Sequence, residues 1–109
     1  MRLFKKLTIL IPCHNEEKGI GTVIDNVPLR FLRKMGYITT IIVINNNSTD
    51  KTAQIAAKRN VTVIVEDKKG KGNAMVKGFK NISDDTSLIV MLDGDNTYKS
   101  KEIPRLIEP

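Results

Sequence analysis

The sequence predicts an α/β protein with a Rossmann-like parallel sheet that carries helices on both faces. Four short apolar runs, rich in β-branched residues, alternate with segments whose apolar residues recur at helical spacing. This alternation is typical of parallel strands joined by right-handed crossovers. With 109 residues, of which 40% are hydrophobic and 28% are charged, the chain has the composition of a folded domain. We therefore expect one unit over residues 1–109.

The first strand is predicted over residues 7–11, where an apolar and β-branched run ends at Pro12. The helix after it is expected to be capped by Asn15, with Glu16 and Glu17 in its first turn, where carboxylates suit the helix dipole. One apolar stripe follows at helical spacing, formed by Ile20, Val23, Ile24 and Val27.

Pro28 is expected to interrupt this helix, and a short second helix then follows. The second strand is predicted over residues 38–44, a run apolar enough to be covered on both faces. A polar turn at 45–47 comes directly after it, and Ser48 or Thr49 is expected to cap the next helix.

The second half repeats the alternation, with a third strand over 61–65 and a fourth over 87–92. Between them a charged loop leads into a helix that opens near Gly72. The fourth strand is apolar along most of its length, as expected for a strand that lies inside a larger sheet. A last helix is expected to be capped by Ser100 and to turn three apolar residues inward: Ile103, Leu106 and Ile107.

The net charge is +6, and the basic residues are spread along the chain. A solvated basic surface, an anionic ligand or an anionic membrane surface would each account for this charge. Aromatic residues make up 5%, Trp is absent, and no helix gathers the basic residues on one face, so we expect no nucleic-acid partner. No apolar run reaches bilayer-spanning length, and we expect a cytoplasmic protein, with peripheral membrane contact as the alternative.

Asp93, Gly94 and Asp95 form the strongest local signal for a ligand site, because they follow a buried strand directly. In an extended backbone, carboxylates two residues apart project to one side, about 6.6 Å apart along the strand, and repel each other. Mg²⁺ or Mn²⁺ would remove this repulsion, since both prefer oxygen ligands. Gly94 would let a diphosphate approach the backbone. The alternative is an ordinary polar turn.

Lys69, Gly70, Lys71 and Gly72 form a second signal, because two lysines and two glycines precede the start of a helix. A helix N-terminus favours anions such as phosphates. A flexible, solvated loop is the alternative. The motifs of a dinucleotide-binding Rossmann site, a P-loop and a hydrolase nucleophile elbow are absent from the sequence.

Four segments in order resemble the inverting family 2 glycosyltransferases of the GT-A fold, above all the dolichyl- and polyprenyl-phosphate mannose or glucose synthases. The segments are IPCHNEE at residues 11–17, IVINNNSTD at 42–50, KGKGNA at 69–74 and MLDGDNTY at 91–98. The resemblance covers nearly the whole chain. It implies the N-terminal, donor-binding half of the fold, because the catalytic domain of the family is considerably longer.

The resemblance implies a GDP- or UDP-sugar donor, held with Mg²⁺ or Mn²⁺, and inverting transfer of a hexose to a lipid phosphate or glycan acceptor. By matching position, Pro12, His14 and Glu16 would line the nucleoside pocket. Asp93 and Asp95, the last block of the resemblance, would bind the metal and the diphosphate.

Asn45 and Asn46 would lie at the base, where the family usually has acidic residues, so the base itself stays open. The catalytic base is expected in the later half of the family's domain. We therefore expect the 109-residue chain to lack transferase activity on its own, and to self-associate or be marginally stable through its fourth strand. The alternative is a non-catalytic nucleotide-binding or interaction module that keeps the fold.

Overall fold

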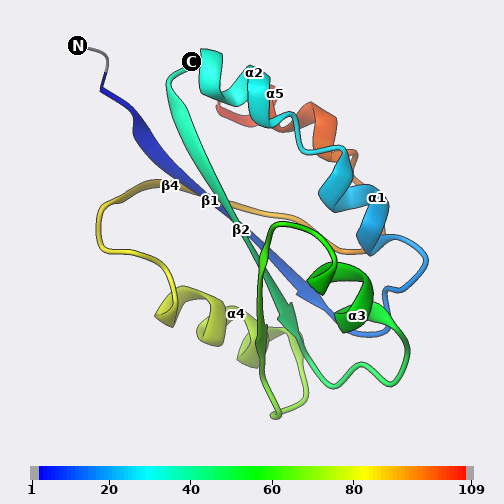
Figure 1. Ribbon diagram of the computed structural model, residues 1–109. Coiled ribbons are helices and arrows are strands. Elements are labelled where there is room, and N and C mark those ends of the chain that lie inside the picture. Colours follow the sequence, from blue (N-terminus) through cyan, green and yellow to red (C-terminus); the bar gives the residue numbers. More distant parts are fainter. Residues whose placement is uncertain (1–2, 108–109) are drawn as a thin grey trace.

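The computed structural model describes residues 3–107, which form a four-stranded sheet with helices on both faces (Figure 1). The ends of the predicted unit, residues 1–2 and 108–109, lie outside the described residues. The strands are β1 (Lys5–Cys13), β2 (Tyr37–Asn45), β3 (Thr62–Val65) and β4 (Thr86–Met91). They pair in parallel in the order β3-β2-β1-β4. The predicted fold class is confirmed.

The helices are short and unequally shared between the two faces of the sheet. They are α1 (Ile20–Asp25), α2 (Leu29–Lys34), α3 (Thr52–Ala57), α4 (Lys71–Lys80) and α5 (Ile103–Ile107), with a 3-10 turn at Ser100–Glu102. Residues of α1, α2, α3 and α5 pack on one face, and α4 covers the other (Figure 1). Within residues 3–107, no helix is long and apolar enough to cross a membrane.

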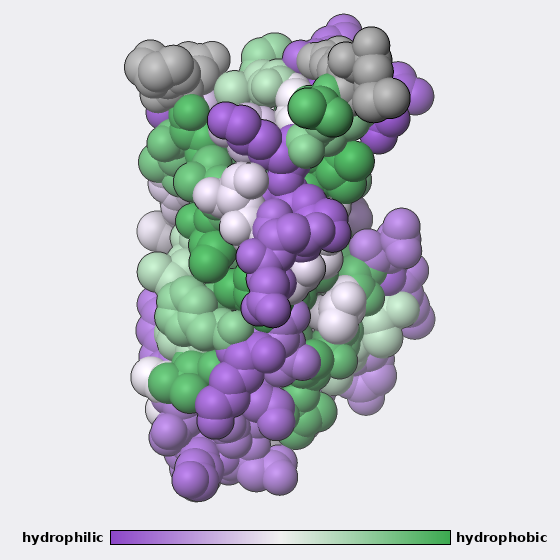
Figure 2. Space-filling view, turned by 90° about the vertical axis from the view of Figure 1, so that its left-hand side faces the viewer, coloured by the Kyte–Doolittle hydropathy of each residue, from purple (hydrophilic) through white to green (hydrophobic). Residues whose placement is uncertain are grey.

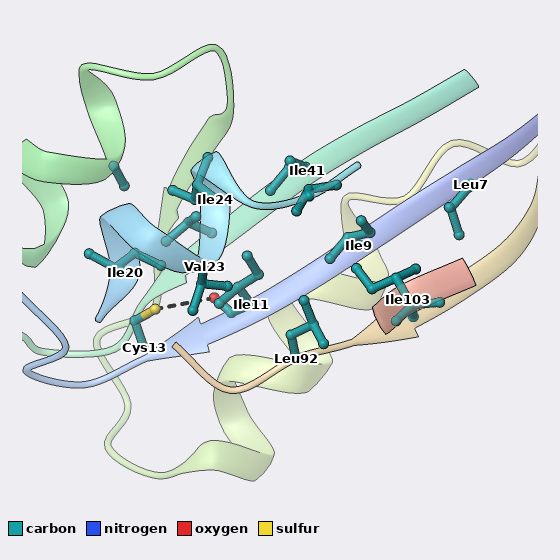
Figure 3. Packing of buried hydrophobic residues seen from close by; sticks show 14 of the residues in the cluster. Leu7, Ile9, Ile11, Cys13, Ile20, Val23, Ile24, Ile41, Leu92 and Ile103 are labelled. Atoms are coloured by element: carbon teal, nitrogen blue, oxygen red, sulfur yellow. Dashed lines mark hydrogen bonds between the residues drawn. The ribbon is translucent and has the colours of Figure 1, made fainter. Parts of the chain in front are cut away.

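The core is built around β1, whose side chains are buried on both faces of the sheet from Leu7 to Cys13. Successive side chains of a strand point to opposite faces, so β1 contributes to two clusters. Leu10 packs with Ile42, Ile44 and α4 on one side. The other cluster lies under α1 and α5 (Figure 3), and its β1 members are Leu7, Ile9, Ile11 and Cys13.

β4 is an edge strand in the described part of the chain, and its side chains on the α4 side of the sheet are poorly covered. Ile89 and Met91 point to the α4 side of the sheet and are 40% and 55% exposed, because α4 packs chiefly against β1 and β2. Figure 2, which looks at the left-hand side of Figure 1, shows apolar surface beside hydrophilic side chains. An unpaired apolar edge favours association with another chain, and self-association stays a prediction.

The structure corrects the predicted start of the first helix. Asn15 lies in a left-handed turn with φ 54°, and α1 begins later, at Ile20. The Asn15 side chain instead accepts the backbone N–H of Thr49 at 2.7 Å and that of Asp50 at 3.3 Å. Its hydrogen bonds therefore cap the loop before α3, which lies far along the sequence, rather than its own helix.

The other predicted caps are also wrong. The backbone N–H of Thr52 at the start of α3 donates to Asp50 at 2.9 Å, and neither Ser48 nor Thr49 fills that place. Ser100 is buried in the 3-10 turn, and its hydroxyl donates to the carbonyl of Val23 at 2.7 Å. It thereby ties this turn to α1.

The apolar positions of the helices fit the prediction better than the caps do. The stripe of the first helix is buried, although Val27 lies beyond the end of α1. Pro28 separates α1 from α2 as expected. In α5, Ile103 is buried and Ile107 packs against the core, but Leu106 is 55% exposed, so the prediction that Leu106 turns inward is wrong.

Candidate functional site

The strand order reverses between β1 and β4. From β1 the chain proceeds to β2 and β3 on one side, and β4 returns to the other side of β1. In open parallel sheets, ligands bind outside the carboxyl ends of the strands at such a point. A pocket of about 250 Å³ lies there, lined by Pro12, Cys13, His14, Glu16, Asn46, Lys71, Ala74, Asp93 and Asp95.

Most of the residues predicted for the site line this pocket, and Asn45, Lys69 and Gly94 are the exceptions. Lys69 lines an adjoining hollow of about 270 Å³ together with His14 and Gly70. Asn45 is the last residue of β2, and its side-chain oxygen accepts the backbone N–H of Ser48 at 3.2 Å. That bond shapes the turn at 45–48.

Gly94 has a packing role at the end of β1, and its approach to a diphosphate stays a prediction. It is buried, and a Cβ at this position would lie 2.6 Å from the sulfur of Cys13 and 3.2 Å from Cγ of Glu16. The absent side chain therefore lets the 93–95 turn pack against the end of β1.

Gly19 positions the same turn from the other side, and no motif in the sequence pointed to this residue. A Cβ there would lie 2.7 Å from the carbonyl oxygen of Gly94 and 2.8 Å from the backbone carbon of Asp95. These distances are shorter than real Cβ contacts, so the backbone of the turn reaches its place only because Gly19 has no side chain. The turn is thus held between Gly19 and Cys13.

The two carboxylates of the turn have different partners. Asp93 forms an ion pair with Lys71, with 2.6 Å between the carboxylate oxygen and Nζ. Asp95 accepts the backbone N–H of Thr97 at 2.9 Å, and this hydrogen bond holds the pKa of Asp95 below its usual value. Both side chains are exposed, and carboxylates are hard oxygen donors.

Glu16 lies half-buried above the turn, in a negative environment. Burial raises its pKa, and the nearby carboxylates of Asp95, Asp93 and Asp50 raise it further, in that order, while His14 opposes the shift. A cation at Asp93 and Asp95 would relieve this repulsion. No group of three or more His, Cys, Asp or Glu side chains within residues 3–107 is arranged to hold a metal. A cation here would therefore take its remaining ligands from phosphate and water, as Mg²⁺ commonly does.

Cys13 contributes packing to the site and no nucleophile. Its side chain is buried at the end of β1, and its thiol donates a weak hydrogen bond to the carbonyl of Ile11 (Figure 3). Burial raises the pKa of the thiol to about 12, with smaller effects from Glu16, Asp50 and Asp93. Because the reactive form of cysteine is the thiolate, a thiol that stays neutral at physiological pH is inert.

A larger hollow of about 610 Å³ adjoins the pocket and shares Pro12, Lys71 and Asp93 with it. The rest of its lining is mainly apolar: Gly72, Met75, Met91, Leu92, Tyr98 and Leu106. Asp93, Asp95 and the side chain of Asn46, which is almost completely buried, meet in the smaller pocket, so the polar groups of a ligand would bind there.

Comparison with known proteins is consistent with this geometry. Residues 8–109 match the model of the family described as glycosyl transferase family 2. Protein RfbJ of Shigella flexneri is 37% identical over 105 residues, which cover 93% of this chain and 73% of RfbJ. The undecaprenyl-phosphate 4-deoxy-4-formamido-L-arabinose transferase of Pectobacterium atrosepticum is 29% identical over 111 residues, covering 95% of this chain and 33% of that protein.

A similar solved structure is glucosyl-3-phosphoglycerate synthase from Mycobacterium tuberculosis in complex with Mn²⁺, uridine diphosphate and phosphoglyceric acid. It superposes with a TM-score of 0.69 at 26% sequence identity, over 83% of this chain and 33% of that one. The chain thus spans most of RfbJ, but about a third of the transferase and of the synthase.

The packing of Gly94 predicts a loss of stability when a side chain is added. We expect Gly94→Ala to lower the free energy of unfolding by about 1–3 kcal/mol, because the new Cβ overlaps the sulfur of Cys13. The control is Gly72→Ala, since a Cβ at Gly72 meets nothing within 4 Å, and alanine favours a helix. Urea unfolding measures both. Equal stability of the two variants would contradict the packing role.

The raised pKa of Glu16 predicts that removing its charge increases folding stability by an amount that depends on pH. A carboxyl whose pKa is higher in the folded protein loses folding stability as the pH rises from its ordinary value, near 4.5, to the folded value. Glu16→Gln should therefore stabilise the protein at pH 7, and the gain should shrink as the pH falls below 4.5. Glu17→Gln, an exposed change in the same turn, is the control. Urea midpoints at both pH values test this, and a Glu16→Gln variant less stable than wild type at pH 7 would refute it.

Proposed function

The chain belongs to glycosyl transferase family 2, and on this premise we propose that it binds the nucleoside-diphosphate part of a sugar donor for inverting transfer of a hexose. The observation that carries the proposal is the meeting of Lys71, Asp93 and Asp95 in one pocket at the point where the strand order reverses. A cationic side chain and two carboxylates at this edge suit a diphosphate that is bound together with a divalent cation.

The start of α4 supports a diphosphate in this position. α4 begins at Lys71, and no side chain among residues 3–107 caps its N-terminus. Its first backbone N–H groups are therefore open to an anion, and the helix dipole favours negative charge there. Lys69 and Lys71 add positive charge on either side of Gly70, whose φ of 117° shapes the turn. We assign the phosphates to this turn and to the end of α4.

Mg²⁺ or Mn²⁺ is the cation that we propose, with Asp93 and Asp95 as its protein ligands. The synthase with a similar structure is complexed with Mn²⁺ and uridine diphosphate, which supports both the metal and a UDP-linked donor. When bound, such a cation stabilises the negative charge that develops on the leaving diphosphate. In the free protein Lys71 neutralises Asp93, so its ammonium occupies the position of a counter-ion.

For the acceptor we propose a polyprenyl phosphate, reached at a membrane surface. The name of the Pectobacterium relative includes undecaprenyl phosphate, and the complex of the synthase includes phosphoglyceric acid. Both names contain a phosphate-bearing compound. The net charge of +6 supports contact with a surface of anionic lipid headgroups.

If Asp95 binds the metal, the effect of substituting it on UDP affinity should depend on whether the cation is present. Asp95→Asn keeps an oxygen for the N–H of Thr97 but removes the charge. We expect it to weaken UDP binding in Mn²⁺ by about tenfold, ~1.4 kcal/mol, and to change binding in EDTA by less than about twofold. Asp84→Asn, an exposed change of equal charge in the α4–β4 loop, is the control. Isothermal titration measures both conditions, and an equal loss in both would refute the metal role. Wild-type protein that binds neither UDP nor GDP would refute the proposed function itself.

The ion pair between Lys71 and Asp93 predicts opposite effects on two ligands. Lys71→Gln should raise the affinity for Mn²⁺ alone by about two- to fivefold, since an exposed ion pair is worth up to about 1 kcal/mol and its loss frees Asp93. The same change should weaken UDP binding, because a phosphate loses its cation. Lys80→Gln, at the other end of α4, is the matched control. If both affinities fell together, Lys71 would not be a counter-ion of Asp93.

A further inference from the structure

Asn46 lies where the loops after β1, β2 and β3 meet, and its side chain is almost completely buried, at 5% exposure. The side-chain amide donates to the backbone carbonyl of Glu66 at 3.0 Å and to that of Lys68 at 2.8 Å. The side-chain oxygen accepts the backbone N–H of Gly70 at 3.0 Å. Both amide protons and the oxygen are therefore bonded to one segment, the loop at residues 66–70 between β3 and α4.

The backbone of Asn46 is fixed as firmly as its side chain. Its N–H donates to the carbonyl of Cys13 at 2.8 Å, and its carbonyl lies 2.8 Å from Nδ1 of His14, which donates to it. Asn46 thus connects the end of β1 with the loop that leads into α4. A residue that reads a base needs donors or acceptors that face the ligand, and both protons of this amide face the protein instead.

We infer that Asn46 is a positioning residue that holds the 66–70 loop in the shape that presents Lys69, Lys71 and the start of α4 to the diphosphate. This inference rests on the proposed function and gives Asn46 a different role from the base contact expected from the sequence. Only an amide satisfies the loop, because its NH₂ donates to two carbonyls while its oxygen accepts an N–H. An aspartate of the same size could not donate and would face two carbonyl oxygens in a buried position.

Two substitutions test this role in the whole protein. Asn46→Asp keeps the size and removes both donors, and Asn46→Ser removes the reach of the amide without adding charge. Asn81→Asp is the matched control, because its exposed amide also donates to one backbone carbonyl, that of Lys77 at 2.9 Å, away from the pocket. Hydrogen exchange of the 66–71 backbone amides is measured without ligand. Titrations with UDP and with uridine, in Mn²⁺, then separate the phosphates from the base.

We expect both Asn46 variants to exchange the 66–71 amides faster, to bind UDP at least about tenfold more weakly and to change uridine binding by less than about twofold. Unchanged exchange or unchanged UDP affinity would overturn the inference. An equal loss of affinity for UDP and for uridine would indicate that Asn46 contacts the base. An effect confined to Asn46→Asp would mean that added charge alone acts, and if that variant does not fold, Asn46→Ser decides. If the wild-type protein does not bind UDP, the proposed function is wrong. Hydrogen exchange of the 66–71 amides then still tests whether Asn46 holds the loop in place.

Discussion

The burial of β1 on both faces is the constraint on which the rest of the structure depends. β1 pairs with β2 on one side and β4 on the other, and its side chains from Leu7 to Cys13 are buried. A strand that is packed above, below and on both sides has no freedom to shift its register. Its carboxyl end therefore gives the site a fixed wall at Pro12 and Cys13, and the 93–95 turn packs directly against that wall.

The distribution of charge in the site differs from that of the chain as a whole. The protein carries a net charge of +6, yet Glu16, Asp93 and Asp95 gather at one sheet edge. There the pKa of Glu16 is raised, first by its burial and then by the nearby carboxylates. Like charges brought together oppose folding, and such arrangements are concentrated at functional sites. Lys71 offsets part of this charge, through an exposed ion pair with Asp93 and a weaker attraction to Asp95. The remaining negative charge is what a cation would neutralise.

The sequence predicts the sheet and the edge that carries the site, because strands and helices follow from periodicity and the carboxyl ends of parallel strands lie together. It does not predict the caps, since Asn15 bonds to Thr49, a partner distant in sequence. The same holds for Gly94, where a Cβ would meet Cys13, and for Gly19, whose neighbour is the carbonyl of Gly94. The local sequence pattern identifies where a turn lies. Contacts between turns that are distant in sequence decide which atoms each side chain meets.

These contacts between turns divide the polar side chains of the site into two kinds. Asn15, Asn46 and Asn47 bond to backbone groups of neighbouring loops. Asp93 and Asp95 are exposed; Asp93 pairs with Lys71, and Asp95 accepts an N–H from its own turn. An amide suits the first task because it is neutral, donates and accepts, so it can be buried against carbonyls and N–H groups together. A carboxylate only accepts and is costly to bury, so it suits the surface that meets a cation. Asparagines thus set the positions of the loops, and the carboxylates of the 93–95 turn remain available to a ligand.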